Sequence, residues 1–311
     1  MKKYKNLVLE DSNIRNTRSL LFILFLLSIS VLINVNARLY EKNVWLENPT
    51  VFSVGDDPLV RSGDPAYFVK IAQYLKKDES IYNYIDKIDY PVISKKNNKS
   101  TLMKLMPVIL GTSKQVDTPL ISLTVSYLAK GSSLKEIINA GNFLILIASA
   151  ITTIGIFFMF FIIGRPFEGI VASLGAGISS HYLGRSSIGF IDTDILNLFF
   201  IYLLFTFVYL ASKKQSWYKN IVFIIIAGLI GKLFFLWYPK PPLIFLSFFS
   251  LVFFTTIHTK DWKRIIFNCG SFIILTNAHI FLDFISIFRN NPYLAGYLSA
   301  NVEITDLVNK T

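Results

Sequence analysis

Residues 182–200 read YLGRSSIGFIDTDILNLFF, which places an arginine and two aspartates directly before an apolar run. Asp194 immediately precedes that run, so it is well placed to cap a helix there. Asp192 is then the freer of the two carboxylates and the better candidate ligand. Arg185 lies seven residues before Asp192. It either anchors a helix end at a membrane surface or binds a phosphate oxygen through its guanidinium group.

The composition indicates that this stretch belongs to a membrane protein. The chain has 311 residues, of which 53% are hydrophobic and only 16% are charged, with 28 Phe. Soluble domains carry about 25% charged residues, so we predict an all-α polytopic membrane protein. The net charge of +11 does not indicate a nucleic-acid partner, because the basic residues cluster at the ends of apolar segments. The one cysteine, Cys269, lies in an apolar run, which excludes a disulfide framework and a thiolate metal site.

Apolar runs predict about seven transmembrane helices, since a span needs roughly 20 mostly apolar residues. The weakest of them, 169–183, is rich in Gly, Ala and Ser, which lets helices approach closely in a bundle. The first run is read as a retained anchor and not as a signal peptide. The predicted spans are 19–35, 143–163, 169–183, 195–211, 221–237, 243–257 and 265–287.

The basic residues orient these spans, because short cytoplasmic loops hold most of the Lys and Arg. With the N-terminus in the cytoplasm, Arg185 and Lys240 are the only basic residues in the two short external loops. We therefore expect a cytoplasmic segment 1–18, a membrane domain 19–288 with an external loop 37–140, and an external segment 289–311. The basic residues on the cytoplasmic side are Lys2, Lys3, Lys5, Arg15, Arg18, Arg165, Lys213, Lys214, Lys219, Lys260, Lys263 and Arg264.

Three external segments then offer carboxylates on one side of the membrane. In RSGDPAYFVKIAQYL, Asp64 is either a helix N-cap before Pro65 or a site residue. The tail SANVEITDLVNKT supplies Glu303 and Asp306. Carboxylates without a His or Cys cluster are hard oxygen ligands, which suit Mg²⁺ or Mn²⁺. Two short apolar pieces of the long loop, LMKLMPVIL and PLISLTVSYLA, favour interfacial helices over spans.

These residues resemble the catalytic subunit of oligosaccharyltransferases, the N-glycosylating membrane glycosyltransferases of the GT-C class. SGDPAYF matches the family's first external loop, with Asp64 as its key aspartate, and GRSSIGFIDTDILNLFF matches its Arg and D-x-D entering the fourth span. FLWYP matches the Trp-Tyr-Pro that ends the fifth span, at Trp237 and Tyr238. The similarity covers about residues 19–311, the amino-terminal membrane part only. No Trp-Trp-Asp-Tyr-Gly motif is present, so a truncated or split form is expected.

The resemblance implies a GT-C-like bundle that transfers an oligosaccharide from a lipid pyrophosphate to the Asn of Asn-x-Ser/Thr. It implies a divalent metal, Mn²⁺ or Mg²⁺, held by Asp64, Asp192 and Asp306, and a donor pyrophosphate bound by Arg185. Asp64 with Asp306 or Glu303 would be catalytic, and Asp194, Trp237 and Tyr238 would be structural or support the ligands. In the tail, VEITDL puts Asp306 at the acidic position of the family's Ser/Thr-x-x-Glu, and alignment on Glu303 instead leaves Ala300 at the first position.

The implied partners are a lipid-linked oligosaccharide, an acceptor protein and the lipid bilayer, with the active site on the external, periplasmic or lumenal face. Two alternatives remain open at this point. One is another polyprenyl-phosphate-dependent GT-C enzyme, such as a protein O-mannosyltransferase or a lipid A sugar transferase. The other is a non-catalytic polytopic protein, which predicts no dependence on a divalent metal.

Overall fold

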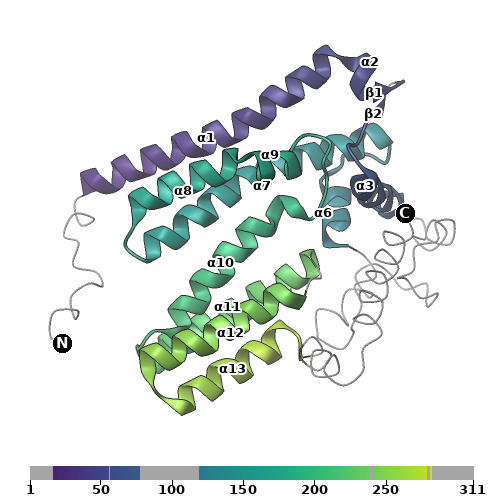
Figure 1. The fold of residues 1–311 in the computed structure, drawn as a ribbon. Helices are drawn as coiled ribbons and strands as arrows, with labels where there is room; N and C mark the ends of the chain where they lie inside the picture. The colour runs from purple at the N-terminus through teal and green to yellow at the C-terminus, as the bar shows by residue number, and fades with distance from the viewer. Residues whose placement is uncertain (1–16, 56, 78–118, 239–240, 279–280, 282–311) are drawn as a thin grey trace, which may run out of the picture.

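The protein is a bundle of long helices with a small two-stranded hairpin beside it (Figure 1). The computed structural model describes residues 17–55, 57–77, 119–238, 241–278 and 281. The antiparallel hairpin pairs Ser53 with Pro58 and Val54 with Asp57. The elements are α1 (Thr17–Glu47), α2 (Pro49–Phe52), β1 (Ser53–Val54), β2 (Asp57–Pro58), α3 (Gly63–Lys76), α6 (Leu120–Leu128), α7 (Leu134–Ile162), α8 (Pro166–Ile178), α9 (Ser180–Arg185), α10 (Asp194–Ser212), α11 (Trp217–Trp237), α12 (Pro241–Thr259) and α13 (Trp262–Thr276).

The long helices run back and forth between two ends of the bundle, as the contacts at each end show. The last residue of α11, Trp237, hydrogen-bonds Thr193 just before α10. At the opposite end, Ser212 at the end of α10 contacts His258 near the end of α12. We call the first of these the α3 end, because α3 and α6 pack there against each other and against α7. The alternation agrees with the predicted polytopic all-α class.

Among the described residues, five helices are long and apolar enough to cross a membrane. The first, α1, has 31 residues. At 1.5 Å per residue it is roughly 46 Å long, whereas the hydrocarbon core of a bilayer is about 30 Å thick. The helix is therefore longer than the apolar layer is thick. The five are Ser19–Glu47 of α1, Leu134–Ile162 of α7, and the whole of α10, α11 and α12.

The other two predicted spans differ from the structure. The predicted span 169–183 is divided at Ser179 into α8, which has 13 residues, and α9, which has 6. Ser179 ends α8 and its hydroxyl accepts a hydrogen bond from the backbone N–H of Tyr182, which starts a new helix. The prediction of 265–287 corresponds to α13, which has 15 residues, and its later part lies outside the described residues.

Helix α7 begins nine residues before its predicted start at 143. Its first turn is closed by a capping box, in which Ser133 and Glu136 exchange hydrogen bonds between side chain and backbone. A capping box satisfies two of the backbone groups that a helix start leaves open, so it sets the first residue irrespective of hydropathy. Of the two predicted interfacial helices, PLISLTVSYLA contains α6, whereas LMKLMPVIL lies outside the described residues.

The core lies around α10, which packs against α7, α11 and α12. Its Leu204 is fully buried, as are Ile145 of α7 and Ile224 of α11. Near the α3 end, Phe200 of α10 stacks on Phe234 of α11 with ring centroids 5.4 Å apart. This packing fixes the first turn of α10, and therefore the Asp192–Asp194 segment before it, against the last turn of α11.

A second, polar contact joins α1 to α7 and α8. The amide of Asn34 is fully buried and donates to Thr153 Oγ1 at 2.8 Å and to the carbonyl of Ser173 at 3.4 Å. Gly177 makes room for it, because a Cβ at this position would lie 2.2 Å from the Asn34 amide atoms. Close approach of small residues is how helices pack where lipid supplies no hydrophobic driving force.

We expect Gly177→Ala to destabilise the bundle by about 1–3 kcal/mol, because the new methyl group displaces a buried, hydrogen-bonded amide. Gly175→Ala, two residues away on the same helix, meets no atom within 4 Å and is the matched control. It should be neutral or stabilise by up to about 1 kcal/mol. Thermal unfolding in detergent measures both. Equal unfolding temperatures for the two variants would contradict the packing.

Candidate active site

The segment before α10 holds Asp192 in a defined conformation. Its side chain is 7% exposed, and its Oδ1 accepts hydrogen bonds from the Thr193 backbone N–H at 2.5 Å and from Thr193 Oγ1 at 3.1 Å. Both contacts fall on Oδ1, so Oδ2 has no hydrogen-bond partner among the residues that the structure describes. The side chain is thus oriented by one oxygen while the other stays available to a ligand.

The Trp-Tyr pair at the end of α11 lies beside this segment, and its tryptophan contacts the segment directly. Trp237 is 3% exposed, and its indole Nε1 donates to the carbonyl of Thr193 at 2.6 Å. Its ring lies 6.3 Å from that of Phe200, centroid to centroid. A buried indole N–H needs an acceptor, so the bond fixes both the ring and the backbone between the two aspartates. The supporting role of Trp237 in the site stays a prediction.

Tyr238 follows Trp237 and lies within the electrostatic field of the same charges. Its pKa is raised by burial first and then by the charges of Asp194 and Asp192, whereas Arg185 acts in the opposite direction. The ring of Tyr238 stacks on Phe234, with centroids 6.4 Å apart. The supporting role of Tyr238 in the site stays a prediction.

Asp194 pairs with Arg185. The carboxylate Oδ2 lies 3.4 Å from the guanidinium of Arg185, and Oδ1 accepts from the Asn197 amide at 2.8 Å. The expected capping role is wrong in position, because Thr193 is the N-cap residue and Asp194 is the first residue of α10. A carboxylate in the first turn still interacts favourably with the positive end of the helix dipole.

Arg185 ends α9 and has about half of its side chain exposed, at 49%. Its guanidinium also lies over the ring of Phe190, 5.4 Å from the centroid. An exposed ion pair is worth less than about 1 kcal/mol, so a ligand phosphate can replace Asp194 as its partner at little cost. The geometry is compatible with the predicted pyrophosphate contact and does not test it.

Asp64 reaches this cluster from a separate segment of the chain. It is exposed and lies in the first turn of α3, where Ser62 is the N-cap residue, so the expectation that Asp64 itself caps the helix is wrong. The backbone N–H of Arg61, three residues before Asp64, donates to the carbonyl of Gly189, three residues before Asp192, at 3.1 Å, and the charge of Asp64 contributes to the raised pKa of Asp192. Two of the three expected acidic segments therefore meet at the α3 end.

The pKa of Asp192 is raised above its usual value, with burial as the largest cause. Hydrogen bonds from Thr193 act in the opposite direction, and the charges of Asp194 and Asp64 raise it further. Mutual repulsion of carboxylates is the usual condition in which a bound cation is stabilising. The donors are hard oxygens, so they fit Mg²⁺ or Mn²⁺ better than a soft metal.

The expected third metal ligand is a carboxylate of the tail. Glu303 and Asp306 both lie outside the described residues. Within the described part, no three His, Cys, Asp or Glu side chains are grouped closely enough to hold a metal ion. Metal binding by Asp64, Asp192 and a tail carboxylate stays a prediction.

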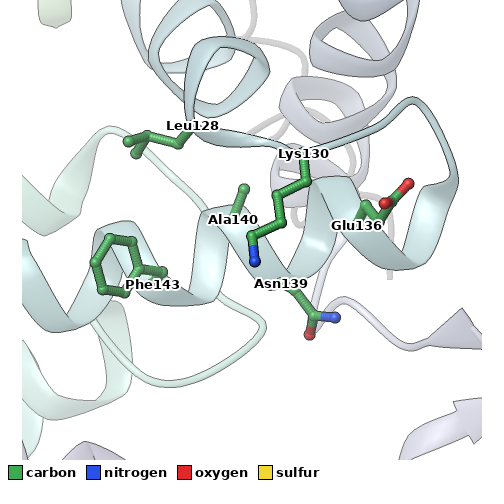
Figure 2. Close-up of a pocket in the computed structure, with 6 residues that line it drawn as sticks. All are labelled: Leu128, Lys130, Glu136, Asn139, Ala140 and Phe143. Atoms are coloured by element: carbon green, nitrogen blue, oxygen red, sulfur yellow. The ribbon is translucent and has the colours of Figure 1, made fainter.

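A hollow beside the site involves none of these residues. Figure 2 shows Lys130 extending over the start of α7, the helix that carries Glu136, Asn139, Ala140 and Phe143. The hollow has a volume of about 440 Å³. Most of its side chains are exposed, so it is a surface depression and not a buried site. It is lined by Leu128, Lys130, Glu136, Asn139, Ala140 and Phe143.

Several side chains that hold the site were not identified from the sequence. Arg38 is fully buried, and its guanidinium donates to the carbonyl of Ser186 at 3.2 Å. Glu41 accepts from the backbone N–H of Ile188 at 3.0 Å. The sequence offered little signal for them, because charged residues at the end of an apolar run are also expected from membrane topology alone.

The fold and this cluster define a polytopic membrane protein whose charged site lies where helix ends and connecting segments meet. A family model described as "Oligosaccharyl transferase STT3, N-terminal" matches residues 110–305, which is more than half of the chain. The chain therefore belongs to this oligosaccharyl transferase family, in its N-terminal membrane part. Arg185, Asp192 and Trp237 fall within the match, whereas Asp64 precedes it. No curated protein and no solved structure matches the chain.

We expect Asp192→Asn to raise the unfolding temperature in metal-free buffer at about pH 7.5, because the variant removes a charge that burial disfavours. The raised pKa means that ionisation of Asp192 costs stability. The cost is absent below the unfolded value near pH 3.9, where both states hold the proton, and it grows as the pH rises through the folded pKa. The gain should therefore shrink when unfolding is measured at about pH 4.5.

Asp57→Asn, which changes a half-buried aspartate in β2, is the control for this substitution. It should not reproduce the rise. If Asp192→Asn lowers the unfolding temperature by the same amount at both pH values, the electrostatic account of Asp192 is contradicted.

Proposed function

We propose that the protein transfers an oligosaccharide from a lipid-pyrophosphate donor to the side-chain amide of Asn in Asn-x-Ser/Thr sequons. Family membership supports the oligosaccharyl transferase class. The observation that carries the proposal is the backbone hydrogen bond from Arg61 to Gly189, which brings the segment of Asp64 against the segment that holds Arg185, Asp192 and Asp194. A site at the helix ends allows the lipid part of the donor to stay in the bilayer.

The acceptor amide is a poor nucleophile because its lone pair is delocalised into the carbonyl group. A carboxylate that hydrogen-bonds its N–H groups orients the nitrogen and weakens that delocalisation, and Asp64, being exposed, is the candidate among the described residues. In the transfer, the amide nitrogen forms a bond to the anomeric carbon of the first sugar. The bond from that carbon to the pyrophosphate oxygen breaks with its electron pair, and the amide proton passes to a carboxylate.

The leaving pyrophosphate gains negative charge in this step. Arg185, at the surface of the site, is placed to pair with a phosphate oxygen through its planar guanidinium. A divalent cation held by Asp64 and Asp192 would supply further compensation for that charge when bound. Trp237 and Thr193 keep the Asp192 carboxylate oriented while charge develops.

We further propose that the α3 end faces the periplasm, lumen or exterior. The opposite end carries basic residues in the α7–α8, α10–α11 and α12–α13 connections and in the first turns of α11 and α13, and short cytoplasmic loops are rich in Lys and Arg. These residues are Arg165, Lys213, Lys214, Lys219, Lys260, Lys263 and Arg264.

The reaction is tested with the chain in vesicles that contain lipid-linked oligosaccharide and a fluorescent Asn-x-Thr peptide, with glycosylated peptide as the readout. Asp64→Asn and Asp192→Asn should each lower the rate by about 10²–10³-fold, the usual effect of losing an electrostatic contact in a transition state. Chelation should abolish activity and added Mn²⁺ or Mg²⁺ should restore it.

Asp57→Asn keeps the same chemical change seven residues before Asp64 and should retain the parent rate. A peptide with Gln in place of Asn should remain unmodified. A parent without activity, or aspartate variants with the full parent rate, would show that the proposed reaction is wrong for this chain.

A further inference from the structure

The outer turns of α1 contact the segment before α10 at three successive points. Arg38 donates to Ser186, Glu41 accepts from Ile188, and the ring of Trp45 lies against Gly189. Residues 38, 41 and 45 are three and four positions apart, so they share one face of the helix. One face of α1 therefore contacts the segment 186–189 at Ser186, Ile188 and Gly189; α1 and α9 are labelled in Figure 1.

Gly189 is held by contacts on both sides of its backbone. Its N–H donates to the Asn142 side chain at 2.8 Å, and its carbonyl accepts from the backbone N–H of Arg61 at 3.1 Å. Its φ of +79° is a conformation that favours glycine. A Cβ here would lie 2.4 Å from the Trp45 ring, so the indole occupies the space that only glycine leaves.

Arg61 joins the two segments through its side chain as well. Its guanidinium pairs with Glu41 Oε1 and lies over the Trp45 ring, 5.5 Å from the centroid. Glu41 thus uses one carboxylate oxygen for Arg61 and the other for Ile188. A single carboxylate therefore joins the segment that leads to Asp64 to the segment that leads to Asp192.

The contact between Arg61 and Gly189 lies close in the chain to both candidate carboxylates. Arg61 lies three residues before Asp64, and Gly189 lies three residues before Asp192. The backbone hydrogen bond between them is therefore a fixed point close to both carboxylates. Asp64 belongs to a helix and Asp192 is held by Thr193 and Trp237, so little freedom remains between the fixed point and either carboxylate.

We propose that Glu41 and Arg61 are positioning residues, which set the separation between Asp64 and Asp192. Together with Trp45 and Gly189 they form a contact, here called the clasp, between the segment that leads to Asp64 and the segment that leads to Asp192. The catalytic consequence rests on the proposed function. Whether the clasp holds the two segments together is tested by a distance measurement, without any reaction.

The first test measures the distance between the two segments by spin labels. Gly63→Cys and Gly184→Cys place labels where a side chain meets no atom within 4 Å, and Cys269→Ala removes the native thiol. The parent should give a narrow distance distribution in vesicles. Glu41→Gln keeps an acceptor for Ile188 but loses the ion pair, so it should broaden the distribution. Glu41→Ala loses both contacts and should broaden it further.

Glu168→Gln is the matched control, because Glu168 forms an exposed ion pair with Arg165 at the opposite end of the bundle. It should leave the distribution unchanged. Distributions that stay narrow in both Glu41 variants would overturn the clasp, and so would equal broadening in Glu168→Gln.

The second test asks whether the clasp matters to the reaction. If Asp64 and Asp192 are no longer aligned, more Mn²⁺ should be needed for half-maximal rate, by about threefold for Glu41→Gln and about tenfold for Glu41→Ala. A merely destabilised protein would lower the maximal rate in proportion to its folded fraction and leave the Mn²⁺ requirement unchanged. Circular dichroism unfolding supplies that fraction.

The two tests fail in distinguishable ways. An inactive parent contradicts the proposed function, while the spin-label distances still decide whether the clasp exists. An active parent whose Glu41 variants show broad distances but the parent's Mn²⁺ requirement would overturn the positioning role.

Discussion

The architecture depends on satisfying the backbone of the segment between α9 and α10, which is buried although it is neither helix nor strand. Buried N–H and C=O groups must be paired, because an unpaired group costs about as much as a lost hydrogen bond. Here the partners come from α1, α7, α11 and the residues before α3, so the segment is satisfied only when these parts of the chain are assembled. The pairs are Arg38 with the Ser186 carbonyl, Glu41 with the Ile188 N–H, Asn142 with the Gly189 N–H, Arg61 with the Gly189 carbonyl, and Trp237 with the Thr193 carbonyl.

This arrangement explains how a membrane protein can keep two neighbouring carboxylates in one place. Asp192 is buried and Asp194 is paired with Arg185, while Asp64 adds a further negative charge nearby. Repulsion among them would favour separation of the two segments. The contacts of Glu41, Arg61 and Gly189 join the two segments and oppose that separation.

Much of the fold could be predicted, because a helix that crosses a bilayer must be long and apolar. The runs that became α1, α10, α11 and α12 follow that rule. Prediction was less accurate where polar contacts set the ends: the capping box of Ser133 and Glu136 starts α7 early, and Ser179 divides one predicted span into α8 and α9. Local hydrogen bonds of this kind leave no mark on hydropathy.

The sequence by itself determined the membrane class, the resemblance to the oligosaccharyl transferase family and the candidates Asp64, Arg185, Asp192 and Asp194, because residue type and spacing carry that information. Tertiary structure alone decided that Asp194 is engaged by Arg185, that Trp237 supports Thr193, and that Arg38 and Glu41 hold the site. These contacts join residues that are nine to almost 150 positions apart. Which of many polar side chains meet at such separations is set by helix packing, and no local pattern in the chain encodes it.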